Sequence, residues 1–525
     1  MSRSRTWRQQ VEMSNTHTLG ESEAHLSKLF ESLTIEDGES YPPFRWQMRM
    51  LKRLIDEDIP QIVDVPTGLG KTSVMALWLI ALAEGAKLPR RLVYVVDRRA
   101  VVDQATRYAE RLRANLPADL ASGLGLDTSA GGLPISTLRG GFADNREWLE
   151  DPSKPAVIVG TVDMIGSRML FEGYGVSRRM RPYHAGLLGV DALVLLDEAH
   201  LCPPFEAMLR QVAALRAGES DSNGNGGWSP PPFRLMSLSA TGHEADEAPP
   251  SKAFKLEPQD REEAEVRRRL HAKKILYINQ LDDISTLTEQ MANRAVTLAG
   301  QGDSFSRVIV FCDTRKDALD VNHIIEKQFK GKRSTCSVED GCHLELLVGE
   351  RRVRERSDLE HWLDEHGFLG QAKTRAEKPT FLVATSAGEV GVDLNADHVV
   401  CDLVAYERMV QRLGRVNRRG GDDRQALVDV FCAPPPAPKA NASKAAKDRH
   451  VGQLETFENR RGALLLLPVG DDDRRDASPY ACGELKLSHA DRVNAATTPQ
   501  PLHPALSRPL LDAWSMTSLN QHSGR

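Results

Sequence analysis

The sequence predicts an α/β protein built from two domains, each a parallel sheet with helices on both faces. Two series of alternating segments carry this prediction. Short apolar runs alternate with helical runs from about residue 60 to residue 245, and a similar series follows from residue 307 to residue 431. Such alternation predicts strands that pair in parallel and helices that cover the sheet. The chain has 525 residues, 41% hydrophobic and 27% charged, so it can bury substantial cores without disulfides.

The first series contains strands and helices of ordinary length. Strands are predicted at residues 61–65, 91–96, 156–160, 192–196 and 233–238, and helices at 74–82 and 101–112. An Asn/Gly/Ser-rich stretch at 220–232 interrupts the pattern and predicts a loop.

The second series follows a charged stretch at 257–274, which favours a solvated linker helix. Strands are predicted at 307–311, 380–384, 398–403 and 427–431, with a helix at 317–330. The predicted organisation is a flexible lead at 1–40, one α/β domain at 41–250, a second at 251–433, and a Pro-rich linker with a partial accessory region at 434–525.

Charge and cysteine content exclude several classes of protein. The 68 basic and 73 acidic residues give a net charge of −5, so any binding of nucleic acid must come from local patches. Seven cysteines without a Cys-x-x-Cys pair argue for a reducing compartment and against a disulfide framework or a zinc ribbon. Cys336, Cys342 and His343 lie close in sequence, but a fourth metal ligand is not visible, so a flexible insert is favoured.

Targeting signals are not apparent. No run of about 18 apolar residues occurs, which predicts no transmembrane helix and no membrane partner. Arg3, Arg5 and Arg8 are not followed by an apolar run, so a secretory signal is not expected and the predicted location is the cytoplasm.

The strongest local motif is Val-Pro-Thr-Gly-Leu-Gly-Lys-Thr at 65–72, between a predicted strand and a helical run. Its glycines allow backbone N–H groups to surround phosphate oxygens at a helix N-terminus. Lys71 would reach the β- and γ-phosphates and Thr72 would hold Mg²⁺. The phosphate-loop pattern asks for glycine at position 65, where this chain has valine, and a simple Gly-rich turn is the alternative. The predicted nucleotide-binding residues here are Thr67, Gly68, Gly70, Lys71 and Thr72.

Two further motifs fit ATP chemistry. The apolar strand at 192–196 ends in Asp197 and Glu198, which could hold Mg²⁺ and polarise the attacking water; acids at a helix start are the alternative. Residues 411–420 carry four arginines within eight positions, either as a solvated basic face or as arginines that meet a γ-phosphate held by the other domain.

Taken in order, these motifs resemble those of superfamily 2 helicases of the DEAH type. The ordered set is Gln47, 68–72, 197–200, 239–241 and 411–418. Residues 93–99, 160–165, 310–315 and 385–393 resemble motifs Ia, Ic, IV and V of that superfamily. The amino-acid sequences of 93–104, 136–141 and 197–201 are similar to those of the helicase component of type I CRISPR interference, nearest to the subtype called I-U or I-G.

The resemblance implies two RecA-like domains with ATP in the cleft between them and ATP-driven movement along single-stranded DNA. Its implied partners are an RNA-guided surveillance complex and an HD-type nuclease. This chain contains no His-Asp dipeptide, so we expect the nuclease domain or subunit to be supplied elsewhere. The rival hypotheses are another superfamily 2 motor acting on DNA or RNA, and a clamp that binds ATP without hydrolysing it.

The resemblance also implies roles for individual residues. Gln47 would read the adenine edge, Gly391 and Asp393 would lie near the nucleotide, and Gln411, Arg415 and Arg418 would act on the γ-phosphate. The residues expected to couple the domains are His200, Ser239 and Thr241. Those expected to contact nucleic acid are Arg98, Arg139, Thr161, Arg315 and Thr385, with ion pairs to Asp97 for Arg98 and to Asp313 for Arg315 as the alternative.

Overall fold

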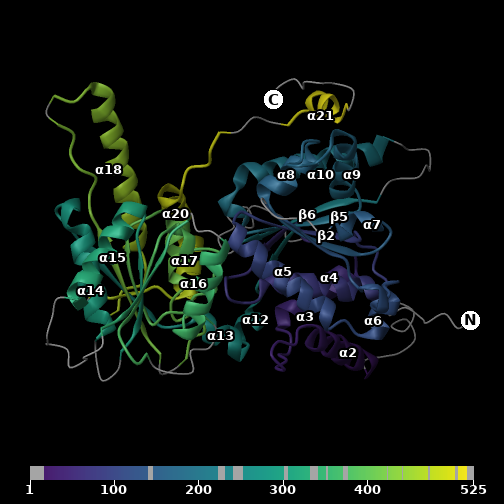
Figure 1. The fold of residues 1–525 in the computed structure, drawn as a ribbon, viewed down its shortest axis with the longest axis horizontal. Helices are drawn as coiled ribbons and strands as arrows, with labels where there is room; N and C mark the ends of the chain where they lie inside the picture. Colours follow the sequence, from purple (N-terminus) through teal and green to yellow (C-terminus); the bar gives the residue numbers. More distant parts are fainter. Residues whose placement is uncertain are drawn as a thin grey trace, which may run out of the picture. The chain divides into compact units, whose positions relative to one another are not determined.

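The computed structural model describes residues 17–139, 146–222, 231–239, 252–300, 305–330, 341–349, 353–369, 376–421, 424–439, 441–470, 473–502 and 506–516 (Figure 1). The chain forms two compact units. Unit 1 comprises Met1–Glu263 and Gln500–Arg525, and unit 2 comprises Ala264–Pro499. Each unit contains one sheet with its own helices, which confirms the predicted fold class.

The sheet of unit 1 has the strand order β3-β4-β2-β5-β6-β1-β7, and every pairing in it is parallel. The strands are β1 (Ile62–Asp64), β2 (Arg91–Val96), β3 (Ile135–Leu138), β4 (Ala156–Thr161), β5 (Ala192–Asp197), β6 (Phe233–Ser239) and β7 (Ala253–Lys255). Strands β2 and β4 are buried along their whole length, as their nearly continuous apolar sequences require of the centre of a parallel sheet.

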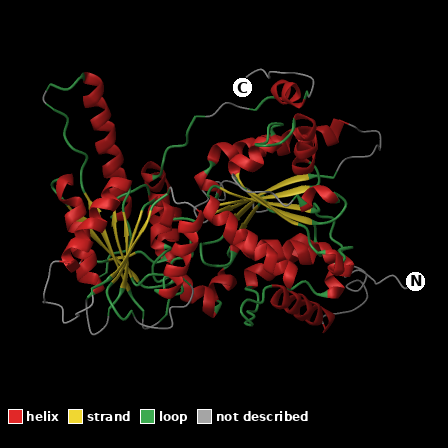
Figure 2. Ribbon diagram, viewed as in Figure 1, coloured by secondary structure: helices red, strands yellow, loops and turns green. Residues whose placement is uncertain are grey.

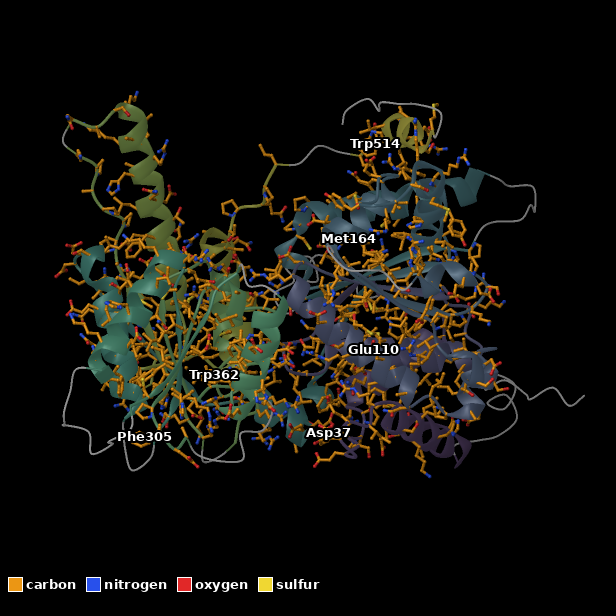
Figure 3. The ribbon with its side chains drawn as sticks, in the orientation of Figure 1. Asp37, Glu110, Met164, Phe305, Trp362 and Trp514 are labelled. Atoms are coloured by element: carbon orange, nitrogen blue, oxygen red, sulfur yellow. The ribbon has the colours of Figure 1, made fainter. Side chains whose placement is uncertain are left out.

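Helices cover both faces of this sheet (Figure 2). Figure 3 labels Glu110 and Met164 on helices that lie on opposite faces. One face carries α4 (Val74–Ala83) and α5 (Arg99–Ala114), with α3 (Arg45–Ile55) and α6 (Ala118–Gly123) packed on α4. The other face carries α8 (Val162–Met169), α9 (Arg181–Gly189) and α10 (Pro203–Ser222), and the short helix α7 (Glu147–Glu150) lies beside β3 and β4.

The lead differs from its prediction, because its second half is helical. Helix α2 (His17–Leu33) packs on α4 and buries Leu26, Leu29, Phe30 and Leu33. These residues follow the i, i+3, i+4, i+7 spacing of an apolar helical stripe. Residues 17–33 are therefore part of the fold rather than a flexible lead.

The sheet of unit 2 has the order β10-β11-β9-β12-β13-β8-β14, parallel throughout except for the antiparallel pair of β14 and β8. Its strands are β8 (Lys274–Gln280), β9 (Arg307–Phe311), β10 (His343–Leu347), β11 (Thr380–Ala384), β12 (His398–Asp402), β13 (Ala426–Cys432) and β14 (Arg475–Asp476). One face packs on α14 (Leu287–Ala299) and α15 (Arg315–Lys330); the other packs on α16 (Val353–Glu365) and α17 (Tyr406–Leu413).

The region after the Pro-rich segment also differs from its prediction. Helices α18 (Lys444–Leu464), α19 (Pro479–Ser488) and α20 (Ala490–Ala496) bury apolar side chains in the core of unit 2. This stretch is thus an integral part of the second domain, not a separate partial region. Beyond it, α21 (Arg508–Ser515) belongs to unit 1, where the Leu506 N–H donates to Gln211 Oε1 at 2.8 Å.

The predicted linker helix at 257–274 is two short helices, α12 (Pro258–Glu262) and α13 (Ala264–Leu270), and strand β8 starts at its last residue. Within the described part of the chain, no helix combines the length and apolarity needed to cross a membrane.

Candidate nucleotide and nucleic-acid sites

The glycine loop joins β1 to a helix start, as predicted. Gly68 and Gly70 have φ angles of 85° and 79°, which side chains rarely tolerate. A Cβ atom on Gly70 would lie 3.1 Å from Gln47 Nε2, so the loop also needs glycine there for space. A single 3-10 turn, Lys71–Ser73, then leads into α4. The loop therefore has the local geometry of an anion-binding helix start.

Valine at position 65 also has a structural explanation. Val65 is fully buried, and its N–H donates to the Ser239 carbonyl at 3.2 Å. Ser239 is itself buried at the end of β6 and pairs in register with Asp64. Ser239, which was predicted to couple the domains, thus contacts Val65, the first residue of the glycine-loop motif. Thr241 lies outside the described residues.

Lys71 and the two acidic residues come together at the carboxyl ends of the strands. Lys71 Nζ lies 3.3 Å from Glu198 Oε1, and only 7% of the Lys71 side chain is exposed. Glu198 has a left-handed φ of 48°, and its N–H donates to Asp197 Oδ1 at 3.0 Å. His200 Nδ1 lies 3.5 Å from Glu198 Oε2. The structure therefore brings together residues that are 127 positions apart in sequence.

Asp197 has a further partner that the motifs did not reveal. The Tyr94 hydroxyl, on β2, donates to Asp197 Oδ2 at 2.7 Å. Burial and the adjacent Glu198 charge raise the pKa of Asp197 to about 6, although Lys71 and Tyr94 oppose this shift. A tyrosine inside an otherwise apolar buried strand was the available signal, because a buried hydroxyl usually finds a partner.

Gln47 lies at the start of α3 and is 4% exposed. Its Oε1 accepts the Phe44 N–H at 2.8 Å, and its Nε2 donates to Ser73 Oγ at 2.7 Å. The amide therefore links the N-terminus of α3 to the turn that follows the glycine loop. One N–H and one lone pair of the amide remain for a base, so adenine reading by Gln47 stays a prediction.

In unit 2 the arginines gather around one carboxylate, Glu389, which is 1% exposed. Arg408 donates to both Glu389 oxygens at 2.9 Å, and Arg412 Nε donates to Oε1 at 2.8 Å. Arg415 donates to the Glu389 carbonyl at 2.9 and 2.6 Å. Burial opposes ionisation of Glu389, but Arg408 and Arg412 outweigh it and hold its pKa below the usual value.

The two predicted finger arginines flank a second acid. Arg418 Nη1 lies 2.5 Å from Asp393 Oδ1, and Arg415 Nη1 lies 3.9 Å from the same atom. Gly391 has a φ of 94°, so the loop of Asp393 needs glycine there. Gln411 is 6% exposed on α17. The structure therefore gathers Asp393, Arg415 and Arg418, and their roles at a nucleotide stay predictions.

Sequence reasoning missed the roles of Arg408, Arg412, Glu389 and Asp402. Arg412 is fully buried and also donates to Asp402 Oδ1 at 2.7 Å, so it stabilises the fold rather than a phosphate. The only sequence signal was the presence of polar side chains, Arg412 among them, on the face of α17 that the fold buries.

Two family models match the chain. Residues 44–248 match the DEAD/DEAH box helicase model, and residues 304–421 match the model of the CRISPR-associated nuclease/helicase Cas3, C-terminal. The chain carries a DEAD/DEAH helicase domain and a Cas3-like C-terminal domain. The helicase domain holds the glycine loop and Asp197, and the Cas3-like domain holds Glu389 and the finger arginines.

Individual proteins agree with this assignment. The crystal structure of T. fusca Cas3–AMPPNP is 17% identical with a TM-score of 0.57, over 89% of this chain and 54% of that one. DUF1998 helicase MrfA bound to DNA is 14% identical with a TM-score of 0.51, over 88% and 57%. Such identities show the fold alone. Over 70 residues the chain is 37% identical to a Myxococcus xanthus (strain DK1622) protein with the provisional name CRISPR-associated nuclease/helicase Cas3, covering 13% of this chain and 9% of that protein. The chain spans about half the length of the two solved proteins.

The predicted nucleic-acid residues of the helicase domain already have partners within unit 1. Arg98 Nε lies 3.7 Å from Asp97 Oδ2, which is the ion pair given above as the alternative, and Arg139 pairs with Asp103. The Thr161 hydroxyl accepts the Met164 N–H at 3.4 Å and caps α8.

In the Cas3-like domain, Thr385 follows β11 and is 8% exposed, and Arg315 begins α15. Asp313, given above as the alternative partner of Arg315, forms an ion pair with Arg408 at 2.5 Å. Contact of these residues with nucleic acid stays a prediction.

Oxygen atoms are the ligands available for a divalent cation. Thr72 supplies a hydroxyl and Asp197 a carboxylate, and Tyr94 donates to the Asp197 carboxylate at 2.7 Å. Mg²⁺ prefers such oxygen ligands together with phosphate oxygens, so these residues fit a magnesium–nucleotide complex. Among the described residues, no three His, Cys, Asp or Glu side chains cluster as a metal site would require. Cys336 lies outside the described part of the chain, and Cys342 is a free thiol.

Proposed function

We propose that this chain is an ATP-driven motor that moves along single-stranded DNA in type I CRISPR defence. The observation that carries the proposal is the cluster of Lys71, Asp197 and Glu198 beside a glycine loop of the helicase domain. A buried lysine and two strand-end carboxylates at such a loop suit phosphoryl transfer to water. The Cas3-like C-terminal domain and the short sequence match to the Myxococcus xanthus protein support the CRISPR assignment.

The residues divide the work of hydrolysis between them. Backbone N–H groups of 67–71 would surround the phosphates, and the Lys71 ammonium would offset their charge. Glu198 would orient a water molecule and receive its proton as the water oxygen attacks the γ-phosphorus and ADP leaves. Mg²⁺, held by Thr72 and Asp197, would neutralise phosphate charge when bound.

The Cas3-like domain would supply the remaining charge. Arg415 and Arg418 act as fingers on the γ-phosphate in this proposal, with Gln411 beside them and with Gly391 and Asp393 near the nucleotide. Arg415 is held by the Glu389 carbonyl and Arg418 by Asp393. Binding of ATP would therefore have to replace these contacts within unit 2. His200, Ser239 and Thr241 would couple ATP hydrolysis to movement between the domains.

Single-stranded DNA is the proposed track. Hydroxyls and arginines at strand ends can bond phosphates without reading bases, which suits a motor that must move over any sequence. The residues proposed for this track are Arg98, Arg139, Thr161, Arg315 and Thr385. We propose that an RNA-guided surveillance complex recruits the chain in the cytoplasm and that a separate nuclease domain or subunit cuts the DNA.

Two rival functions remain to be tested against this one. Another superfamily 2 motor would show the same ATP site but a preference for RNA or duplex DNA. A clamp that binds ATP without hydrolysing it would have no use for Glu198 or for the finger arginines.

ATP hydrolysis with and without nucleic acid tests the proposal. Single-stranded DNA should stimulate hydrolysis more than duplex DNA or RNA. Lys71→Ala should lower turnover by about 10²–10³-fold or more, because a positioned charge on the phosphates is lost. Glu198→Gln should still bind ATP but hydrolyse it very slowly. Lys87→Ala removes an exposed lysine of the same unit and should behave as wild type.

Each outcome separates one hypothesis from the others. Normal turnover by Lys71→Ala would exclude this nucleotide site. Binding without hydrolysis in the wild-type chain would favour the clamp, and stimulation by RNA alone would favour an RNA motor.

A further inference from the structure

Tyr94 lies at the middle of β2, near the centre of the sheet of unit 1, and is 1% exposed. Its hydroxyl donates to Asp197 Oδ2 at 2.7 Å, and the Thr72 side chain lies near enough to lower the Tyr94 pKa against the effect of burial. One buried oxygen therefore bonds to Asp197 beside Thr72, the two residues proposed above to hold Mg²⁺. None of the sequence motifs includes this role for a tyrosine.

The fold explains how one side chain comes close to both residues. In β2, Val93 and Val95 face the core beneath α8, α9 and α10, so Tyr94 faces the other side, where α4 packs. Thr72 lies in the turn that opens α4, and Asp197 ends β5, the strand beside β2. Tyr94 thus lies between the end of a strand and the start of a helix in the interior.

The chemistry of the hydroxyl suits a permanent donor. Burial and the nearby Asp197 carboxylate raise the pKa of Tyr94 well above its usual value. A phenol is protonated at neutral pH, and the 2.7 Å geometry has it donating to Asp197. A tyrosine has few rotatable bonds, so a buried ring holds its oxygen in a fixed place at low entropic cost.

We infer that Tyr94 is a positioning residue that fixes the Asp197 carboxylate, beside the Thr72 hydroxyl, in the arrangement needed to bind magnesium–ATP. This inference rests on the proposed function. Partners in the outer shell of a metal site orient the ligands, and their loss commonly costs 10–100-fold in metal affinity. Tyr94 acts on the cation only through the Asp197 side chain to which it donates.

Tyr94→Phe tests the inference, because it removes one oxygen atom and keeps the ring. The measurement is binding of a fluorescent ATP analogue to the full chain at increasing Mg²⁺, followed by hydrolysis over the same Mg²⁺ series. We expect the Mg²⁺ concentration for half-maximal binding to rise about 10–100-fold and binding to recover at saturating Mg²⁺. Without Mg²⁺, the variant and the wild type should bind the analogue equally.

Tyr108→Phe is the matched control. Tyr108 lies on α5 of the same unit; its hydroxyl is buried and makes no hydrogen bond with any described residue. This control should keep the wild-type Mg²⁺ dependence. Thermal unfolding of both variants monitors the fold independently of the site.

Two outcomes would overturn the inference while the proposed function stands. In the first, Tyr94→Phe keeps the wild-type Mg²⁺ dependence of binding and hydrolysis. In the second, it loses nucleotide binding equally with and without Mg²⁺, which would assign Tyr94 a purely structural role. If the wild-type chain bound no ATP at any Mg²⁺ concentration, the proposed function itself would fail, and the inference with it.

Discussion

Two buried carboxylates, one in each unit, differ sharply in how the protein treats their charge. Asp197 in the helicase domain has a pKa raised to about 6, because burial and Glu198 outweigh Lys71 and Tyr94. Glu389 in the Cas3-like domain is buried as well, but hydrogen bonds and charges from Arg408 and Arg412 bring its pKa below the usual value. The charge of each carboxylate therefore depends on its neighbouring side chains and not on burial alone.

The difference indicates what each carboxylate is for. Glu389 is satisfied by its own domain and orders the arginines around it. Lys71 lies 3.3 Å from Glu198 and Tyr94 donates to Asp197, yet burial and the charge of Glu198 still raise the pKa of Asp197, which indicates excess negative charge at this carboxylate. A site that carries such an excess gains from a cation and from a ligand that brings one. The surroundings of Asp197 thus favour a cation, whereas Glu389 is already paired with arginines of its own unit.

The largest effect should come from Arg418, which lies at the edge of the arginine cluster. Arg418→Ala should lower turnover by roughly 10³–10⁵-fold, the usual cost of losing an arginine finger. Its melting temperature should change little, since the partner carboxylate of Asp393 is 52% exposed and such pairs contribute at most about 1 kcal/mol. Hydrolysis measured under single-turnover conditions, with thermal unfolding alongside, checks both statements.

Arg419→Ala is the neighbouring control and should retain turnover. An Arg418→Ala variant that hydrolyses ATP at the wild-type rate would remove Arg418 from the reaction. A large drop in melting temperature would instead place Arg418 with the structural arginines.

The central strands could be predicted closely from sequence, whereas the edges could not. Strand β2 was predicted as 91–96 and β5 as 192–196, within one residue of the structure, because both are continuous apolar runs. Strands β3, β7, β8, β10 and β14 were missed. Several of them are short or only partly buried, and β14 has two residues, so their sequences carry little pattern.

The candidate sites likewise contain some features that the sequence could predict and others that it could not. The glycine loop could be predicted because its chemistry is local, and Asp197 and Glu198 were recognised by their place at the end of an apolar strand. Tyr94 and Glu389 could not, because their roles arise from contacts that only the folded chain creates. The Tyr94–Asp197 hydrogen bond joins residues 103 positions apart. Helix α18 posed the same difficulty, since most of its surface is polar and its buried residues lie at one end.

Arg412 provides the next test, because it contacts Glu389 and Asp402 and is fully buried. Arg412→Met should lower the free energy of unfolding of unit 2 by about 3–5 kcal/mol, since it leaves the buried Asp402 carboxylate without its cation and Glu389 with Arg408 alone. Chemical denaturation followed by a probe in unit 2 measures the change. Arg449→Met, at an exposed position on α18, should have no such effect. A stable Arg412→Met variant with lost turnover would show that Arg412 belongs to the reaction instead.

Asp197→Asn should produce a smaller change, of the opposite sign. The folded-state pKa of Asp197 is raised from 3.8 to about 6, so between these values the folded protein binds more protons than the unfolded chain. The contribution of Asp197 to stability is therefore lost as pH rises from about 4 to about 6. At neutral pH the buried, ionised carboxylate destabilises the folded protein. Asparagine carries no charge, so Asp197→Asn should be more stable than wild type at pH 7.5 by about 3 kcal/mol, since each pKa unit of the shift corresponds to about 1.4 kcal/mol. This difference in stability between Asp197→Asn and wild type should become smaller towards pH 4.5. The control Asp56→Asn, at an exposed carboxylate of the same unit, should match the stability of wild type at both pH values.

Asp197→Asn should also abolish Mg²⁺-dependent ATP hydrolysis, so stability and activity would change in opposite directions. An Asp197→Asn variant less stable than wild type at pH 7.5 would mean that Lys71 and Tyr94 already satisfy this charge, and the contrast between Asp197 and Glu389 would disappear.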